Sequence, residues 1–132
     1  MRLFDHLDLR VRDLAAAEPF YRRVLPALGF PHREIEGESI CYGADEDSPR
    51  PRFIALDEDP AYVANSTRVA FWADSRQAVD DFAAVLAQTP ARAVEGPMLC
   101  EEYSPGYYAI FFEDPCGNRF EVCHRVPVEP SA

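Results

Sequence analysis

Near the start of the chain, apolar residues first recur at every second position and then at every third or fourth position. Apolar and polar residues alternate from Leu3 to Val11, which predicts a β-strand. Asp13 is a suitable N-cap, and apolar residues at helical spacing from 14 to 28 predict an amphipathic helix. Gly29 marks the expected end of this helix.

The prolines and glycines of the first half suggest where these elements are interrupted. A proline inside a helix costs about 3 kcal/mol, so Pro19 and Pro26 predict a late or irregular start of the helix and a break near its end. Short strands are expected at 33–36 and 39–43, joined by a turn at Gly37, and then at 52–57.

The second half repeats this order of elements. Residues 67–73 alternate like a strand, and Ser75 is a suitable cap for a helix that carries Val79, Phe82 and Leu86 on one face. Further strands are expected near 92–94, 98–103, 107–113 and 119–125.

When the two halves of the sequence are aligned, His6 corresponds to Arg68. The last strands also align, "RFIAL" at 52–56 with "RFEVC" at 119–123, so that Ile54 corresponds to Glu121. We therefore expect one domain over 1–132, made of a module at about 1–60, a second at about 61–126 and a frayed tail at 127–132. A single βαβββ sheet leaves an apolar face exposed, so we expect the two sheets to enclose a small-molecule pocket.

Composition and charge narrow the class of partner. The 132-residue chain carries 13 basic and 23 acidic residues, for a formal net charge of −10. This charge repels nucleic acid and anionic membranes. Because there is no secretion signal and no long apolar run, we expect a cytoplasmic protein with no membrane partner. The cysteines lack metal-site spacing, so buried, reduced thiols are expected, with Cys116 the most exposed and reactive.

Three stretches carry a family resemblance: "FDHLDLRVRDLAAAEPFYRRVLPALGF" at 4–30, "TRVAFWADSRQAVDDFAAVL" at 67–86 and "EYSPGYYAIFFEDPCGNRFEVCHR" at 102–125. The chain resembles the vicinal oxygen chelate superfamily, which includes glyoxalase I, bleomycin-resistance and fosfomycin-resistance proteins and extradiol dioxygenases. The resemblance implies an α+β fold in which two tandem βαβββ modules pair into a curved, partly closed mixed sheet around a central pocket. It also implies a homodimer.

The resemblance places metal ligands at His6, Arg68, Glu121 and Ile54, and two of these four cannot ligate. Arginine has no lone pair to donate, and isoleucine has no polar atom. His6 and Glu121 thus form an incomplete site for a divalent metal such as Zn, Ni, Mn or Fe. Strand alternation offers Asp8 or Cys123 as a third ligand, because they share faces with His6 and Glu121.

A metal-free alternative uses the same residues. If the modules pack as expected, Arg68 can form an ion pair with Glu121, either as a purely structural pair or as part of an anion-binding pocket with His6 and Arg10. Asp8, Trp72 and one of Tyr107 and Tyr108 are further pocket candidates. The two tyrosines are adjacent on one strand and must point to opposite faces, and the sequence does not decide which faces the pocket.

Two function classes therefore stay open. The first is a lyase, dioxygenase or thiol-transferase-like enzyme, in which His6 and Glu121 act as acid, base or metal ligands. The second is a metal-free protein that binds or sequesters a small molecule, with the ionic groups above in its pocket. The scaffold alone does not separate them, because one fold supports many reactions.

Overall fold

The structure of the protein, a computed structural model, describes residues 2–127. Its internal contacts divide the chain into two compact units, Met1–Asn65 and Ser66–Ala132, here called module one and module two. Each has the order strand, helix, strand, strand, strand, which confirms the predicted βαβββ repeat. The expected frayed tail lies, beyond residue 127, outside the described residues.

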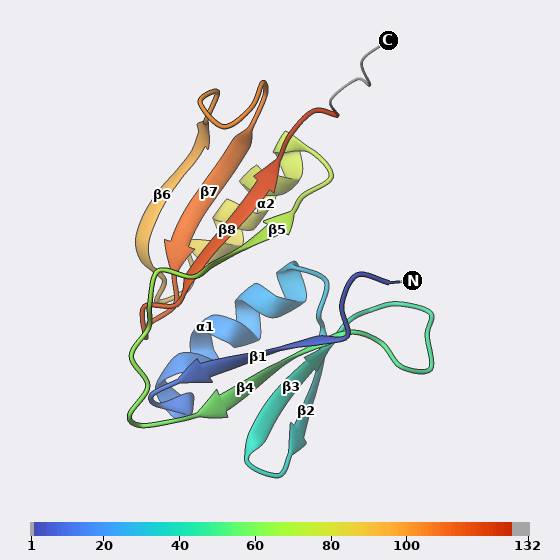
Figure 1. Cartoon of the computed structure of the whole chain (residues 1–132), viewed down its shortest axis with the longest axis vertical. Coiled ribbons are helices and arrows are strands. Elements are labelled where there is room, and N and C mark those ends of the chain that lie inside the picture. Colours follow the sequence, from blue (N-terminus) through green and yellow to red (C-terminus); the bar gives the residue numbers. More distant parts are fainter. Residues whose placement is uncertain (1, 128–132) are drawn as a thin grey trace. The chain divides into compact units, whose positions relative to one another are not determined.

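Module one is a four-stranded sheet with one helix packed on it (Figure 1). Its elements are β1 His6–Val11, α1 Leu14–Ala27, β2 His32–Glu36, β3 Ser39–Gly43 and β4 Phe53–Glu58. The strands lie in the order β1-β4-β3-β2, with β1 parallel to β4 and the other neighbours antiparallel. Gly37 forms the predicted β2–β3 turn with a φ of 61°, a conformation that glycine adopts without steric cost.

Helix α1 runs without interruption, so the irregular start and the break predicted at its prolines are wrong. Pro19 and Pro26 both lie inside the helix. Each removes one backbone hydrogen bond, but the apolar face of the helix compensates for the loss. Phe20 and Tyr21 on that face are fully buried. Tertiary packing of an apolar face is what stabilises most protein helices, and here it outweighs the intrinsic cost of proline.

The sheet of module one has a face packed on α1 and a face turned away from it. The Tyr42 hydroxyl of β3 donates to the Glu18 carboxylate of α1 at 2.6 Å, so Tyr42 marks the helix face. Ile54 lies opposite Tyr42 in the ladder and is also fully buried. Because side chains alternate along a strand, His6 and its ladder partner Phe53 lie on the other face. We call this other face the open face of module one.

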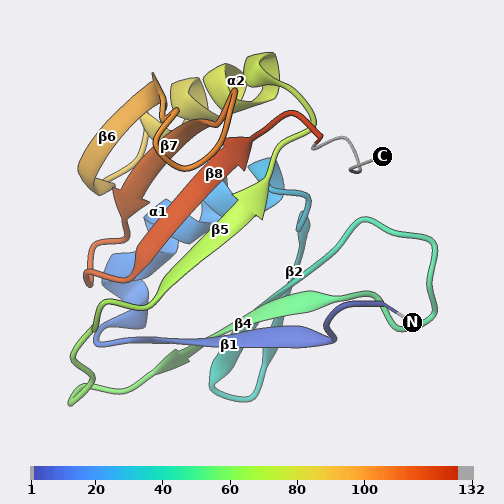
Figure 2. The same cartoon turned by 45° about the horizontal axis from the view of Figure 1, so that its top comes forward.

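Module two repeats this arrangement (Figure 2). Its elements are β5 Arg68–Trp72, α2 Arg76–Leu86, β6 Arg92–Leu99, β7 Tyr108–Glu113 and β8 Arg119–His124. The strand order is β5-β8-β7-β6. The two strands expected at 92–94 and 98–103 are in fact the single strand β6, and turns follow it. The ladder between β6 and β7 shifts register twice, between Arg92 and Met98, and such bulges break the alternation that sequence reasoning relies on.

Two opposite faces can be assigned in module two as well. The Tyr108 hydroxyl donates to the Asp80 carboxylate of α2 at 2.6 Å, which marks the helix face. Tyr108 pairs with His124 in the ladder, so Glu121, three residues earlier on β8, lies on the opposite face. Phe111 and Ala70 are the ladder neighbours of Glu121 on β7 and β5. We call this side the open face of module two.

Both helices begin at the predicted caps. The Asp13 carboxylate accepts a hydrogen bond from the backbone N–H of Ala16 at 3.1 Å, and the Ser75 hydroxyl oxygen accepts one from Ala78 at 3.0 Å. Gly29 follows the end of α1, as predicted, with a φ of 99°. Local side-chain chemistry thus fixes these helix ends.

The α+β fold of two βαβββ modules is as predicted. Each module forms a four-stranded mixed sheet, and neither sheet closes on itself. Within residues 2–127, no helix is long and apolar enough to cross a membrane.

All four cysteines are free and buried, which confirms the expectation of reduced, buried thiols. Cys116, expected to be the most exposed, is only 8% exposed. Its backbone N–H donates to the Asp114 carboxylate at 2.8 Å, and Asp114 is itself fully buried. This turn therefore holds Cys116 in the interior, and the prediction of an exposed Cys116 is wrong. Its reactivity relative to the other thiols stays a prediction.

Candidate functional site

His6 begins β1 and lies on the open face of module one. Its ring stacks on Phe53 with the ring centres 4.6 Å apart and the planes 4° from parallel. Its Nδ1–H donates to the Asp5 carboxylate at 2.8 Å, and Nε2 lies 3.5 Å from the Asp8 carboxylate. The hydrogen bond to Asp5 raises the pKa of His6, and the charge of Asp8 adds to this effect.

Asp8 and Arg10 share this face, as strand alternation predicts. Asp8 is placed beside His6, whereas Arg10 donates to the Asp57 carboxylate of β4 at 2.9 Å. The positive charge of Arg10 is therefore already matched within module one. Arg10 was expected to help attract an anion, and this ion pair reduces its ability to do so.

Arg68 begins β5 on the open face of module two, and its guanidinium lies over the ring of Phe111. The guanidinium carbon is 5.0 Å from the ring centre, within the range of a cation–π contact. Among residues 2–127, Arg68 forms no ion pair. The predicted ion pair between Arg68 and Glu121 is therefore not formed.

The Glu121 carboxylate instead accepts a hydrogen bond from the Tyr107 hydroxyl. Glu121 is only 6% exposed, so this donor satisfies a carboxylate largely shielded from water. Burial raises the pKa of Tyr107, and the adjacent Cys123 and Glu121 raise it further, so the phenol stays protonated. Burial likewise raises the pKa of the Cys123 thiol. Cys123 was a candidate third ligand, and it lies in this same cluster.

The remaining aromatic candidates lie apart from Glu121. Tyr108 lies on the helix face of module two, where its hydroxyl bonds Asp80, so Tyr107 is the tyrosine on the Glu121 side. Trp72 is on the open face and 56% exposed, and its indole N–H donates to Asp74 at 2.9 Å. Only Tyr107 of these three directly contacts the carboxylate of the site.

Comparisons with known proteins decide the family. The model of the Glyoxalase/Bleomycin resistance protein/Dioxygenase superfamily matches residues 3–122. This chain belongs to that superfamily. A comparison with curated protein sequences gave no match.

Solved structures of the glyoxalase/bleomycin resistance/dioxygenase superfamily share its fold. A glyoxalase/bleomycin resistance protein from Albidiferax ferrireducens is 24% identical with a TM-score of 0.73, covering 92% of this chain and 98% of its own. The fosfomycin resistance protein FosX from Listeria monocytogenes is 16% identical with a TM-score of 0.70, covering 96% and 95%. A putative glyoxalase from Bacillus halodurans is 19% identical with a TM-score of 0.69, covering 93% and 96%. At these identities the likeness supports the fold alone.

The ladders correct one of the ligand positions inferred from the superfamily. His6 lies opposite Phe53 in module one, and Arg68 lies opposite Arg119 in module two. With His6 matched to Arg68, Glu121 corresponds to Ala55, and the sequence alignment with Ile54 is wrong by one residue. A shift of one residue moves a side chain to the opposite face of a sheet, and Ile54 indeed faces α1.

The residues at the superfamily's ligand positions do not fit a divalent metal. Arg68 offers no lone pair, Ala55 offers no polar atom, and the Glu121 carboxylate is engaged by Tyr107. Within residues 2–127, no three His, Cys, Asp or Glu side chains gather in a way that suits a metal ion. A catalytic metal normally has three protein ligands, and these positions supply two.

Sequence reasoning missed two contacts of the site: the hydrogen bond from Tyr107 to Glu121 and the stacking of His6 on Phe53. Both join residues from neighbouring strands and depend on ladder register. The adjacent pair Tyr107 and Tyr108 signalled that one ring lies on each face. Only the register of β7 against β8 decides which ring meets Glu121.

Proposed function

We propose that this superfamily member binds a small organic anion, a carboxylate, enolate or phosphate, without a metal. In this proposal the ligand contacts Arg68, Glu121 and Tyr107, all on module two. The observation that carries the proposal is the pairing of Tyr107 with Glu121, which leaves the nearby guanidinium of Arg68 without a carboxylate partner among the described residues.

Arg68 is the proposed anion-binding group. A guanidinium presents parallel N–H donors that match the two oxygens of a carboxylate or phosphate. The Phe111 ring supports the guanidinium from one side without neutralising it. A cation so placed attracts an anion locally, despite the net charge of −10.

Glu121 and Tyr107 orient the ligand in this proposal. The raised pKa of Tyr107 keeps its hydroxyl protonated, so the phenol is a permanent donor that satisfies Glu121. The remaining carboxylate lone pairs accept from a ligand hydroxyl or amine.

A second candidate function, an enzyme of the lyase, dioxygenase or thiol-transferase-like class, is favoured by the hydrogen bond between His6 and Asp5. A carboxylate that orients a histidine and raises its pKa is a common arrangement for proton transfer. This candidate would be supported if the protein turned over a substrate, if His6→Ala abolished kcat, and if Arg68→Gln raised KM without changing kcat.

A binding screen tests the first proposal. Thermal-shift measurements with carboxylates, phosphates and aromatic antibiotics should reveal an anion that raises the Tm of the protein. Arg68→Gln should remove that shift. Arg76→Gln is a matched control, because the Arg76 guanidinium lies 5.4 Å from the Tyr108 ring on the helix face of the same module. Equal shifts in the wild type and Arg68→Gln would contradict the proposal.

The homodimer and the cytoplasmic location remain predictions. Four free, buried thiols support a reducing compartment. Light scattering coupled to size-exclusion chromatography tests the dimer directly.

A further inference from the structure

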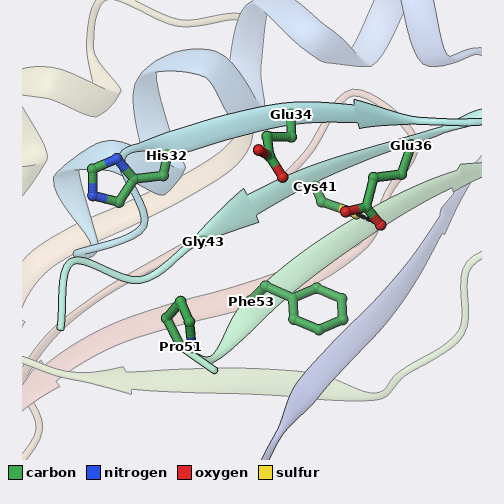
Figure 3. Close-up of a pocket in the computed structure, with 7 residues that line it drawn as sticks. All are labelled: His32, Glu34, Glu36, Cys41, Gly43, Pro51 and Phe53. Carbon is green, nitrogen blue, oxygen red and sulfur yellow. Dashed lines mark hydrogen bonds between the residues drawn. The ribbon is translucent and has the colours of Figure 1, made fainter. Parts of the chain in front are cut away.

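A cavity of about 290 Å³ opens on the open face of module one, over β2, β3 and β4. Figure 3 shows the carboxylates of Glu34 and Glu36 converging from β2 on the side chain of Cys41, with Phe53 on the neighbouring strand. This volume lies at the lower end of the range for small-molecule pockets. All of its lining residues belong to module one, and none of them takes part in the anion site proposed above.

The charge of the cavity is negative. Within the described part of the chain, Glu34 and Glu36 have no ion-pair partner, and Arg33 between them binds Glu18 on the helix face instead. Burial raises the pKa of the Cys41 thiol, and four carboxylates raise it further: Glu36, Asp57, Asp8 and Glu34. The basic groups on this side of the sheet all have carboxylate partners. His32, which lines the cavity, lies with its Nε2 3.4 Å from the Asp45 carboxylate, Arg10 bonds Asp57 and His6 bonds Asp5.

One side of the cavity is apolar. The Phe53 ring stacks on His6 and also lines the cavity, and Pro51 lies beside it. Gly43 leaves its part of the strand without a side chain. A Cβ built there would meet only His32, at 3.6 Å, which is an ordinary van der Waals contact. We expect a larger side chain at position 43 to project into the cavity.

We propose that this cavity binds a small organic cation, an amine or amidine carried on a flat apolar body. The cationic group lies between the carboxylates of Glu34 and Glu36, and the apolar body packs on Phe53. Two carboxylates without basic partners favour a positive group, and an aromatic wall favours both the apolar body and the cation. The proposal rests on module one alone and stands whether or not the anion site exists.

Benzamidine is a suitable probe, with benzamide as its uncharged match and benzoate as its anionic match. In ¹H–¹⁵N spectra of the full chain, benzamidine should shift the amide signals of Cys41 and Gly43. Its affinity should exceed that of benzamide by about ten-fold at low salt and decline as salt is added, because the contacts are exposed charges.

Variants locate the site and separate it from the anion site. Glu34→Gln with Glu36→Gln should reduce benzamidine affinity about ten-fold, the loss expected for two charge contacts. Gly43→Leu should block the cavity while the spectrum remains folded. Glu38→Gln, in the β2–β3 turn outside the cavity, and Arg68→Gln should leave affinity unchanged. Equal binding of benzamidine and benzamide, no binding of benzamidine, or binding that Gly43→Leu does not weaken would overturn the proposal.

Discussion

The Tyr107 hydroxyl donates a hydrogen bond to the buried Glu121 carboxylate. Tyr107 directly precedes β7, and Glu121 lies on the neighbouring strand β8. The superfamily resemblance had assigned Glu121 to metal binding. In this chain a neutral phenol engages the carboxylate instead, and the cation of the site is the guanidinium of Arg68.

Tyr107→Phe removes the donor and leaves Glu121, which is 6% exposed, without its protein partner. We expect the free energy of unfolding to fall by about 1–3 kcal/mol, the usual cost of leaving a buried polar group unsatisfied. Urea denaturation measures the loss. Tyr108→Phe is the matched control and should cost less, because its hydroxyl bonds Asp80 near the surface. Equal losses in the two variants would contradict a special role for Tyr107.

Glu18 of α1 should make stability depend on acid pH. Burial raises its pKa, but hydrogen bonds from Tyr42, Arg33 and Arg22 outweigh burial, and the net pKa is lowered from 4.5. A lowered folded-state pKa stabilises the fold above pH 4.5, and this stabilisation is lost as pH falls through the lowered value.

Urea denaturation of the wild type and Glu18→Gln between neutral and acid pH tests this dependence. The wild type should be more stable near neutral pH, and the difference should shrink as Glu18 becomes protonated. A difference that stays constant or grows toward acid pH would show that the charge of Glu18 is not responsible.

His6 should titrate above its ordinary pKa of 6.5. The hydrogen bond to Asp5 is the main cause, so Asp5→Asn should lower the pKa of His6 more than Asp8→Asn does. Because the folded-state pKa is raised, the interaction stabilises the fold below about pH 6.5 and is lost as pH rises through the folded value. Titration of the His6 imidazole signals by NMR gives the pKa of His6 in the wild type, in Asp5→Asn and in Asp8→Asn. A larger effect of Asp8→Asn would refute this ranking of the two carboxylates.

The ladder register predicts opposite outcomes at two adjacent positions. Ile54→Glu places a charge against α1 in the core of module one and should lower the free energy of unfolding by about 3–5 kcal/mol. Ala55→Glu places it on the open face, where the side chain extends away from α1, and should cost less, although Ala55 itself is only 5% exposed. Thermal unfolding of the two variants compares them. The reverse order would restore the alignment of Ile54 with Glu121.

Most of the fold was predictable because its signals are local. Asp13 and Ser75 cap their helices through contacts three residues away, and the glycines at 29 and 37 lie where the chain turns. The errors arose where tertiary packing or irregular pairing decides the outcome. Buried Phe20 and Tyr21 keep α1 intact despite its prolines. Strand β6 continues through two register shifts against β7, where the sequence pattern predicted two separate strands.

The candidate site was predictable only in part. Repeat alignment placed His6 and Arg68 at corresponding strand positions, but its match of Glu121 with Ile54 was wrong by one residue. Strand alternation correctly placed Asp8 beside His6. The partner of Glu121 depends on the register of β7 against β8, which no local pattern encodes. From the sequence, Arg68 was the expected ion-pair partner of Glu121. In the structure Glu121 accepts a hydrogen bond from Tyr107, and the Arg68 guanidinium lies over the ring of Phe111.

Metal titration of the purified full chain most directly tests whether the site works without a metal. Isothermal titration calorimetry with Zn, Ni, Mn and Fe(II), after purification without chelator and elemental analysis, should show no stoichiometric binding. Arg68→His should create metal affinity if position 68 is the missing ligand position. One equivalent of metal bound by the wild type, and lost in both His6→Ala and Glu121→Gln, would contradict the account.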